Sequence, residues 1–139
     1  MTEQIATTIN LQILTPQKHF LEQEVEMVTI PAFDGEMGVL PGHISMLVTL
    51  QPGLVKIYQG GIVVHSVFVD GGFAQVNNDR VSILIEAAFN RADVNYRDAL
   101  SRMEAITLKL MNVDDPEYQK ILERELAVYQ KMAEIAQGD

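Results

Sequence analysis

Three side chains that could take part in acid–base chemistry or hold a metal ion lie close together in the sequence: Asp34, Glu36 and His43. A carboxylate and an imidazole can exchange a proton during catalysis, and both are ligands for zinc. Their spacing matches no ligand pattern, and the glycine-rich turn that we predict at residues 35–38 would hold side chains too loosely for catalytic geometry. We therefore assign no catalytic residue and no metal ligand, and an enzyme built on these three residues is only a rival hypothesis.

The glycine pairs and the remaining histidines give no further catalytic signal. Gly60-Gly61 and Gly71-Gly72 lack the Gly-Lys-Ser/Thr pattern of a phosphate-binding loop, so we interpret them as turns or bulges. No G-x-S-x-G elbow is present, and His19 and His65 have no evident nucleophile partner. We expect no cofactor and no hydrolytic activity.

The composition predicts a folded protein with an acidic surface. Its 139 residues allow one ordinary domain, or one domain of about 90 residues with an appendage. A net charge of −9 argues against nucleic-acid binding, because phosphate backbones are bound by clustered Lys and Arg. There is no cysteine for a disulfide, no segment of signal-peptide character and no apolar run near the roughly 20 residues that span a membrane. We expect a cytosolic chain that does not insert into a membrane.

Alternating apolar and polar residues predict short β-strands in the first two thirds of the chain. Ile9, Leu11 and Ile13 would lie on one face of a half-buried strand, with Asn10 and Gln12 on the other. The predicted strands cover residues 9–13, 24–30, 44–50, 54–58, 62–69, 73–76 and 81–85.

Turn-forming residues join the last four of these strands in pairs. Residues 59–61 are rich in glycine and residues 77–80 in Asn and Asp, and each stretch predicts a hairpin. Many short strands with turns between them favour an antiparallel sandwich or barrel over a parallel sheet. We predict an antiparallel β-sandwich over residues 1–88.

After residue 90 the apolar spacing changes from two residues to three and four, which is typical of amphipathic helices. One stripe is formed by Tyr96, Ala99, Met103, Ile106 and Leu110. Asp115 and Pro116 then suit the N-cap and first position of a second helix. That helix carries surplus apolar surface at Ile121, Val128, Met132 and Ile135. Because neither helix is long enough to be stable alone, we predict an antiparallel two-helix hairpin over residues 89–139.

The segment from residue 31 to residue 53 has the motif order of a known protein family. Its motifs are Gly35-Glu36-Met37-Gly38, then Pro41-Gly42-His43, then an apolar stretch ending in Pro52-Gly53. Farther along come Asp70-Gly71-Gly72-Phe73-Ala74-Gln75-Val76 and Glu86-Ala87-Ala88. This ordered series, followed by a helical third, resembles the epsilon subunit of F-type ATP synthases over nearly the whole chain.

The resemblance implies a place at the foot of the central stalk of the synthase. Members of that family bind the γ subunit and the membrane-embedded c-ring, and their C-terminal helices can restrain ATP hydrolysis. Glu36, Met37, Gly38 and His43 match positions by which family members meet the c-ring, with γ nearby. An exposed Met next to a carboxylate would suit such a contact. The implied location is peripheral, on the cytoplasmic face of the inner (plasma) membrane.

Three basic residues of the second helix, Lys120, Arg124 and Lys131, share one helical face. They are either a solvated face paired with Glu117 and Glu134 or, as the resemblance implies, contacts to the catalytic β subunits. Residues 91–139 carry seven basic and ten acidic side chains, a net charge of −3. We therefore expect weak inhibition of hydrolysis.

Some members of the family bind ATP through an Ile/Leu-Asp-x-x-Arg-Ala motif at the start of the first C-terminal helix. The corresponding stretch here, Asp93-Val94-Asn95-Tyr96-Arg97-Asp98, does not keep that motif in either frame. We assign no nucleotide site, and Glu86, Arg97 and Arg102 are only weak candidates for one.

The patterns and the resemblance together predict a non-catalytic rotor subunit that links γ to the c-ring for rotary coupling. The first alternative is a free-standing β domain that binds a small ligand. A stalk subunit should leave the cell in complex with γ, whereas an independent binding domain or enzyme should not.

Overall fold

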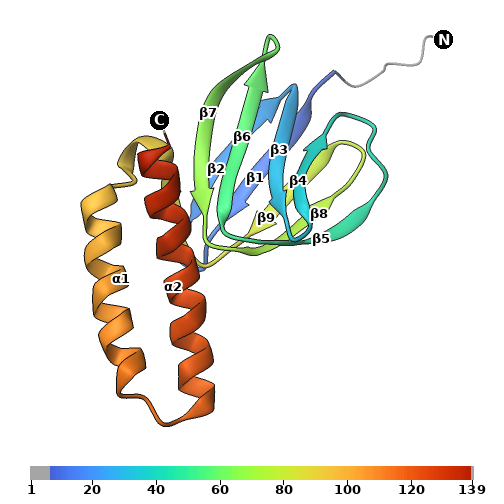
Figure 1. The fold of residues 1–139 in the computed structure, drawn as a ribbon. Helices are drawn as coiled ribbons and strands as arrows, with labels where there is room; N and C mark the ends of the chain where they lie inside the picture. The colour runs from blue at the N-terminus through green and yellow to red at the C-terminus, as the bar shows by residue number, and fades with distance from the viewer. Residues whose placement is uncertain (1–6, 139) are drawn as a thin grey trace, which may run out of the picture. The chain divides into compact units, whose positions relative to one another are not determined.

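The computed structural model describes residues 7–138 and divides the chain into two compact units between Phe89 and Asn90. The first unit is built of β-strands and the second of helices (Figure 1). An N-terminal β-sandwich followed by a two-helix hairpin is the predicted fold class, and it is confirmed. No helix within residues 7–138 is both long enough and apolar enough to span a membrane.

The strands form one sheet that folds over on itself. Their order across the sheet is β10-β7-β6-β3-β5-β8-β9-β1-β2, and β4 pairs with β3 outside this path. From β7 to β2 along this order, and between β3 and β4, neighbouring strands are antiparallel except for β1 and β9, which run parallel. The strands are β1 (Ile9–Leu14), β2 (His19–Val25), β3 (Met27–Ala32), β4 (Gly35–Val39), β5 (Met46–Leu50), β6 (Gly53–Gln59), β7 (Ile62–Val69), β8 (Gly72–Val76), β9 (Arg80–Leu84) and β10 (Ala88–Asn90).

The core lies between the inward faces of the strands and receives aliphatic side chains from each of β1 to β9. Strand β1 shows the predicted alternation, with Ile9, Leu11 and Ile13 buried and Asn10 and Gln12 on the other face. Removing these apolar side chains from water is the main stabilising contribution in a sheet of this kind.

Both predicted hairpins are present. Strands β6 and β7 are joined through Gly60 and Gly61, whose φ angles of 61° and 79° lie in the region that favours glycine. Strands β8 and β9 are joined at residues 77–79, and the N–H of Asn77 donates to the carbonyl oxygen of Arg80 at 2.8 Å.

Two local predictions are wrong. Residues 24–30 are not one strand, because the chain passes from β2 to β3 at Glu26, whose Oε1 accepts a hydrogen bond from the N–H of Gly60. Residues 35–38 are not a turn but most of strand β4, because the turn comes earlier, at Phe33 and Asp34. Glycine was interpreted there as a strand breaker, whereas at Gly38 it leaves room for the Met27 side chain.

The helical unit begins with a short 3₁₀ turn, Arg91–Asp93, followed by α1 (Tyr96–Met111) and α2 (Pro116–Gln137). Asn95 and Asp115 cap the two helices, since each side chain accepts a hydrogen bond from a first-turn N–H. The helices pack on one another as a hairpin (Figure 1). The predicted stripe of α1 is partly confirmed: Ala99 and Ile106 are buried, Met103 and Leu110 are half-buried, and Tyr96 is exposed.

Candidate partner-binding surfaces

The β3–β4 hairpin carries three of the four residues that the sequence indicates for contact with the rotor ring. Opposite residues in its register are Pro31 with Glu36, Ile30 with Met37 and Thr29 with Gly38. The three candidates therefore lie on a strand rather than on a loop, and alternate between its two faces.

Only one of these three offers a side chain to a partner. Glu36 is exposed and pairs with Lys56, with 3.3 Å between Nζ and Oε2. Met37 was expected to be exposed, but it is half-buried and packs against the sandwich core. Gly38 lies over Met27, whose Cε would come within 3.0 Å of an added Cβ. A contact made here would use the charge of Glu36 and the exposed backbone of Gly38.

His43 lies beyond the far end of β4 and is not brought close to Glu36 by the fold. The turn before it is held by Gly42, whose N–H donates to the carbonyl oxygen of Asn78 at 2.7 Å. The His43 Nδ1 makes a 2.8 Å hydrogen bond with the carbonyl oxygen of Ile44. Asp34 sits with Glu36 at the other end of β4, so the three residues do not assemble into an acid–base or metal site. No group of three potential metal ligands occurs in residues 7–138.

A second surface, absent from the sequence-based candidates, lies on the outward face of β8, β9 and β1. Leu84 is directly opposite Phe73 on one side and Leu14 on the other, so the three side chains form a continuous row. We call Leu14, Leu84 and Phe73 the outer apolar row. Phe73 is 51% exposed and Leu84 46% exposed. Contiguous exposed apolar side chains are typical of protein–protein contact surfaces.

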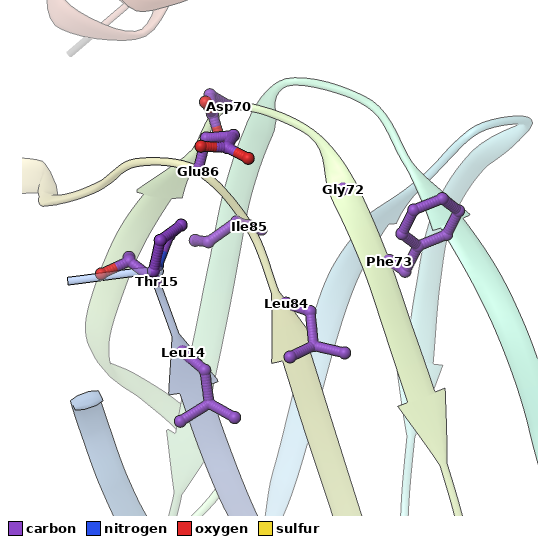
Figure 2. A pocket seen from close by; sticks show the side chains of 9 residues that line it. Leu14, Thr15, Asp70, Gly72, Phe73, Leu84, Ile85 and Glu86 are labelled. Atoms are coloured by element: carbon purple, nitrogen blue, oxygen red, sulfur yellow. The ribbon is translucent and has the colours of Figure 1, made fainter. Parts of the chain in front are cut away.

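The outer apolar row borders an open hollow of about 530 Å³ at one end of the sandwich. Figure 2 shows Asp70 and Glu86 at one end of this hollow and Leu14, Leu84 and Phe73 along it. The Oδ1 of Asp70 accepts a hydrogen bond from the N–H of Ala87 at 3.2 Å, which fixes that carboxylate. The hollow combines an apolar wall with negative charge.

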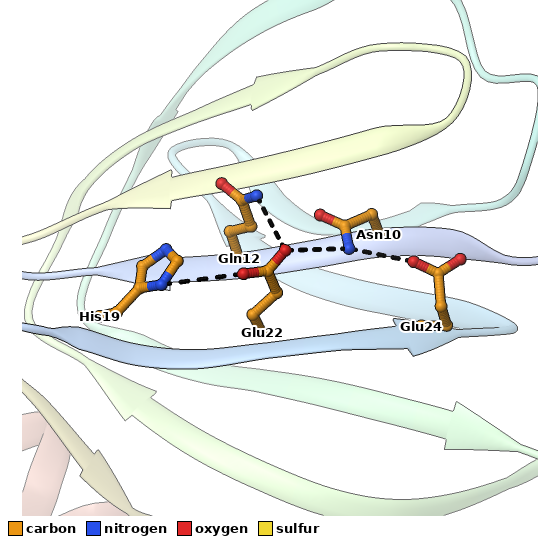
Figure 3. Close-up of polar contacts among 5 residues, drawn as sticks. All are labelled: Asn10, Gln12, His19, Glu22 and Glu24. Atoms are coloured by element: carbon orange, nitrogen blue, oxygen red, sulfur yellow. Dashed lines mark hydrogen bonds and ion pairs between the residues drawn. The ribbon is translucent and has the colours of Figure 1, made fainter.

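A polar network covers the outward face of β1 and β2 next to that row (Figure 3). Glu22 Oε2 accepts hydrogen bonds from the side-chain amides of Asn10 and Gln12, each at 3.3 Å. Asn10 Nδ2 also donates to Glu24 at 3.0 Å, and His19 Nδ1 lies 3.8 Å from Glu22 Oε1. The two side-chain amides and the two carboxylates are engaged with one another, although Asn10 Oδ1 has no hydrogen-bond partner among the described residues. This part of the face is therefore less available than the apolar row.

The basic residues of α2 divide into two kinds. Lys120 and Arg124 are exposed and, within the part of the chain that the structure describes, form no ion pair. Lys131 is half-buried and pairs with Glu134 at 3.2 Å. The solvated salt-bridging interpretation therefore applies to Lys131, and Lys120 and Arg124 are the basic groups open to a partner.

The weak nucleotide candidates lie in different units. Glu86 borders the hollow of the β unit, whereas Arg97 and Arg102 are on α1. Arg102 is already engaged, because it lies over the ring of Tyr129 at 5.7 Å and pairs with Asp98 at 3.4 Å. Interaction with Tyr129 and then with Asp98 raises the pKa of Arg102 above its ordinary value.

Sequence reasoning also missed Phe33, which is 76% exposed at the β3–β4 turn. The signal was available, because Phe33 lies three residues before Glu36, in the segment that the resemblance indicates for contact with the c-ring. The outer apolar row was harder to find, since the alternation of each strand gives its faces but not which residues of neighbouring strands lie opposite one another.

Comparisons with known proteins agree with this architecture. Residues 8–91 match the family described as "ATP synthase, Delta/Epsilon chain, beta-sandwich domain". The chain is 38% identical over 124 residues to the ATP synthase epsilon chain of Nitratidesulfovibrio vulgaris, covering 86% of this chain and 92% of that one. It is 39% identical over 105 residues to the epsilon chain of Granulibacter bethesdensis, covering 76% and 78% of the two chains.

Solved structures give the same result. A chain of the Euglena gracilis mitochondrial ATP synthase, in a structure of its OSCP, F1 and c-ring parts, is 26% identical with a TM-score of 0.77, covering 94% of this chain and 82% of that one. A chain from the central stalk and c-ring of the Tetrahymena thermophila enzyme shares the fold at a TM-score of 0.64 and 15% identity. The sandwich, the helical hairpin and these matches together show that the chain belongs to the family of ATP synthase epsilon chains.

Proposed function

We propose that this chain is a rotor subunit of the central stalk of an F-type ATP synthase. In this role it joins γ to the c-ring, so that ion flow through the membrane part drives ATP synthesis in the catalytic head. The observation that carries the proposal is a match over both units: relatives named epsilon chains align along most of the chain, and the Euglena chain covers 94% of it. The subunit itself performs no catalysis.

The β unit supplies the stalk contacts in this proposal. Glu36, Met37, Gly38 and His43 contribute to the contact with the c-ring and the neighbouring part of γ, with Glu36 as the exposed charge. The outer apolar row supplies the docking surface for γ, because it is exposed and apolar and lies next to a polar, hydrogen-bonded part of the same sheet face.

The helical unit is proposed to be regulatory. Lys120 and Arg124, with a lesser part for Lys131, face acidic segments of the catalytic β subunits when hydrolysis is restrained. The net charge of −3 on residues 91–139 opposes that attraction, which supports weak inhibition. No nucleotide is assigned to Glu86, Arg97 and Arg102, and Arg102 is already held by Asp98 and Tyr129.

The location follows from the assembly. As a subunit of the ATP synthase complex, the chain is proposed to lie peripherally on the cytoplasmic face of the inner (plasma) membrane, bound to the ring through protein contacts. The hollow beside the outer apolar row would suit the alternative, a free-standing domain that binds a small ligand.

Affinity purification of the chain from its own cells separates these two proposals. We expect γ to co-purify with the wild-type chain. Phe73→Asp should reduce the amount of γ recovered, because it places a charge at the more exposed end of the outer apolar row. The matched control is Ile62→Asp, which adds the same charge at an exposed apolar position on the β6–β7 hairpin. A wild-type chain recovered without γ would contradict the rotor proposal.

A second test addresses the ring contact. Glu36→Ala in the assembled synthase should weaken coupling between ATP hydrolysis and ion pumping, since a charge that loses its partner at an interface typically costs about 1–3 kcal/mol. Lys56→Ala is the control, because it breaks the same surface ion pair and leaves Glu36 in place. Unchanged ATP-driven pumping in Glu36→Ala would remove Glu36 from the contact.

A further inference from the structure

Phe33 is the most exposed aromatic side chain among the described residues of the β unit. It is large and apolar, yet 76% exposed, and it occupies a turn between two strands. Isolated exposed apolar residues are common on proteins, but aromatic residues that project from well-held backbone are frequent anchors of protein interfaces.

The turn is fixed by three hydrogen bonds to strand β5 and to Gln51, the residue that follows it. The N–H of Phe33 donates to the carbonyl oxygen of Thr49, and the N–H of Gln51 donates to that of Pro31, both at 2.9 Å. The side-chain amide of Gln51 donates to the carbonyl oxygen of Ala32, also at 2.9 Å. Phe33 thus projects from a platform that loses little conformational entropy when a partner binds.

The charges next to this ring are negative. Asp34 follows Phe33 in the turn, and its side chain has no hydrogen bond or ion pair among the described residues. Glu36 lies two residues after Asp34, on β4, and its carboxylate is paired with Lys56. The free charge at the apex therefore belongs to Asp34. Consecutive exposed residues of the turn thus offer a cation an aromatic ring and a carboxylate.

Resting on the proposed function, we propose that Phe33 and Asp34 form a clamp for an arginine side chain on the loop of the rotor ring that faces this hairpin. A planar guanidinium can stack on the ring of Phe33 while it pairs with the carboxylate of Asp34, which the compact ammonium of lysine does less well. In this arrangement Phe33 and Asp34 provide the anchor and Glu36 provides supporting charge.

The direct test measures binding of the purified full-length chain to the purified rotor ring. Phe33→Ala should weaken binding on the order of tenfold, and Phe33→Leu nearly as much, because leucine keeps apolar area but lacks the aromatic face. Phe33→Tyr should bind like the wild type. Asp34→Asn should weaken binding and reduce its salt dependence. Ile62→Ala, at an exposed position on another hairpin, is the matched control and should change nothing.

Chemical modification of the rotor ring identifies which of its basic side chains binds Phe33 and Asp34. Blocking the arginines of the rotor ring should reduce the affinity of the wild-type chain to that of Phe33→Ala. Acetylating the lysines of the rotor ring should leave the wild-type chain binding more tightly than Phe33→Ala. If the wild-type chain and Phe33→Ala bound equally only after lysine acetylation, the assignment to arginine would be overturned. Equal binding of Phe33→Ala and the wild type would overturn the clamp while leaving the proposed function standing, and a wild-type chain that does not bind the ring would contradict the proposed function itself.

Discussion

The two units of this chain are stabilised in different ways. In the β unit, each of strands β1 to β9 contributes to one aliphatic core, and many of those side chains are completely buried. In the helical unit only five residues are buried among those described: Ala99, Ile106, Leu122, Met132 and Ala133. Two of the five are alanines, which bury little surface.

This difference in stability suits different roles for the two units. A sheet that encloses its own core is a stable carrier for contact surfaces such as the outer apolar row and the Phe33 turn. A single pair of helices buries one stripe of each helix, and helices of this length are marginal by themselves in water. Marginal stability suits a segment that changes position, because two conformations of similar free energy can be exchanged by modest interactions.

Cutting the chain between the units is the largest disturbance of this comparison. We expect residues 1–90 to fold alone and to bind γ, because the core cluster lies within them. Residues 91–139 alone should show little helix by circular dichroism at 25 °C. The boundary would be wrong if the first fragment were unfolded or the second fully helical.

Matched truncations of one leucine in each unit sharpen the contrast. Leu11→Ala in β1 should lower the free energy of unfolding of the β unit by about 2–5 kcal/mol, since it leaves a cavity in a closed core. Leu122→Ala in α2 should loosen the hairpin and leave the β unit nearly unchanged. Hydrogen exchange resolved by residue distinguishes the two effects, and equal loss of protection in both units after Leu122→Ala would argue against their independence.

A smaller contrast lies within the β unit, between two glycines with positive φ. Gly72 has φ +97°, and an added Cβ would lie 2.2 Å from the carbonyl oxygen of Leu84, so Gly72→Ala should cost about 2–4 kcal/mol of stability. Gly60 has φ +61° with nothing within 4 Å of an added Cβ, so Gly60→Ala should cost about 1 kcal/mol. Denaturant unfolding measures both, and equal losses would show that steric space at Gly72 is unimportant.

The sequence predicted those features that depend on neighbouring residues. Alternation predicted the faces of β1, the glycine and Asn/Asp turns predicted two hairpins, and Asp115-Pro116 predicted the start of α2. Each of these depends on local preference, because a few adjacent residues decide the conformation.

The features that the sequence did not predict depend on contacts between residues far apart in the chain. The break at Glu26 involves Gly60, 34 residues away, and the parallel pairing of β1 with β9 joins segments about half the chain apart. Gly38 belongs to a strand because Met27 packs over it, which no pattern around Gly38 shows. The outer apolar row exists only because the register sets Leu14, Leu84 and Phe73 side by side.

The central claim is that this chain joins γ to the rotor ring. The most direct measurement is ATP-driven ion pumping by membranes whose synthase lacks this chain, before and after the purified full-length chain is added back. The account predicts that pumping is lost or strongly reduced without the chain and restored by its addition. If the number of ions pumped per ATP hydrolysed were the same with and without the chain, the account would be contradicted.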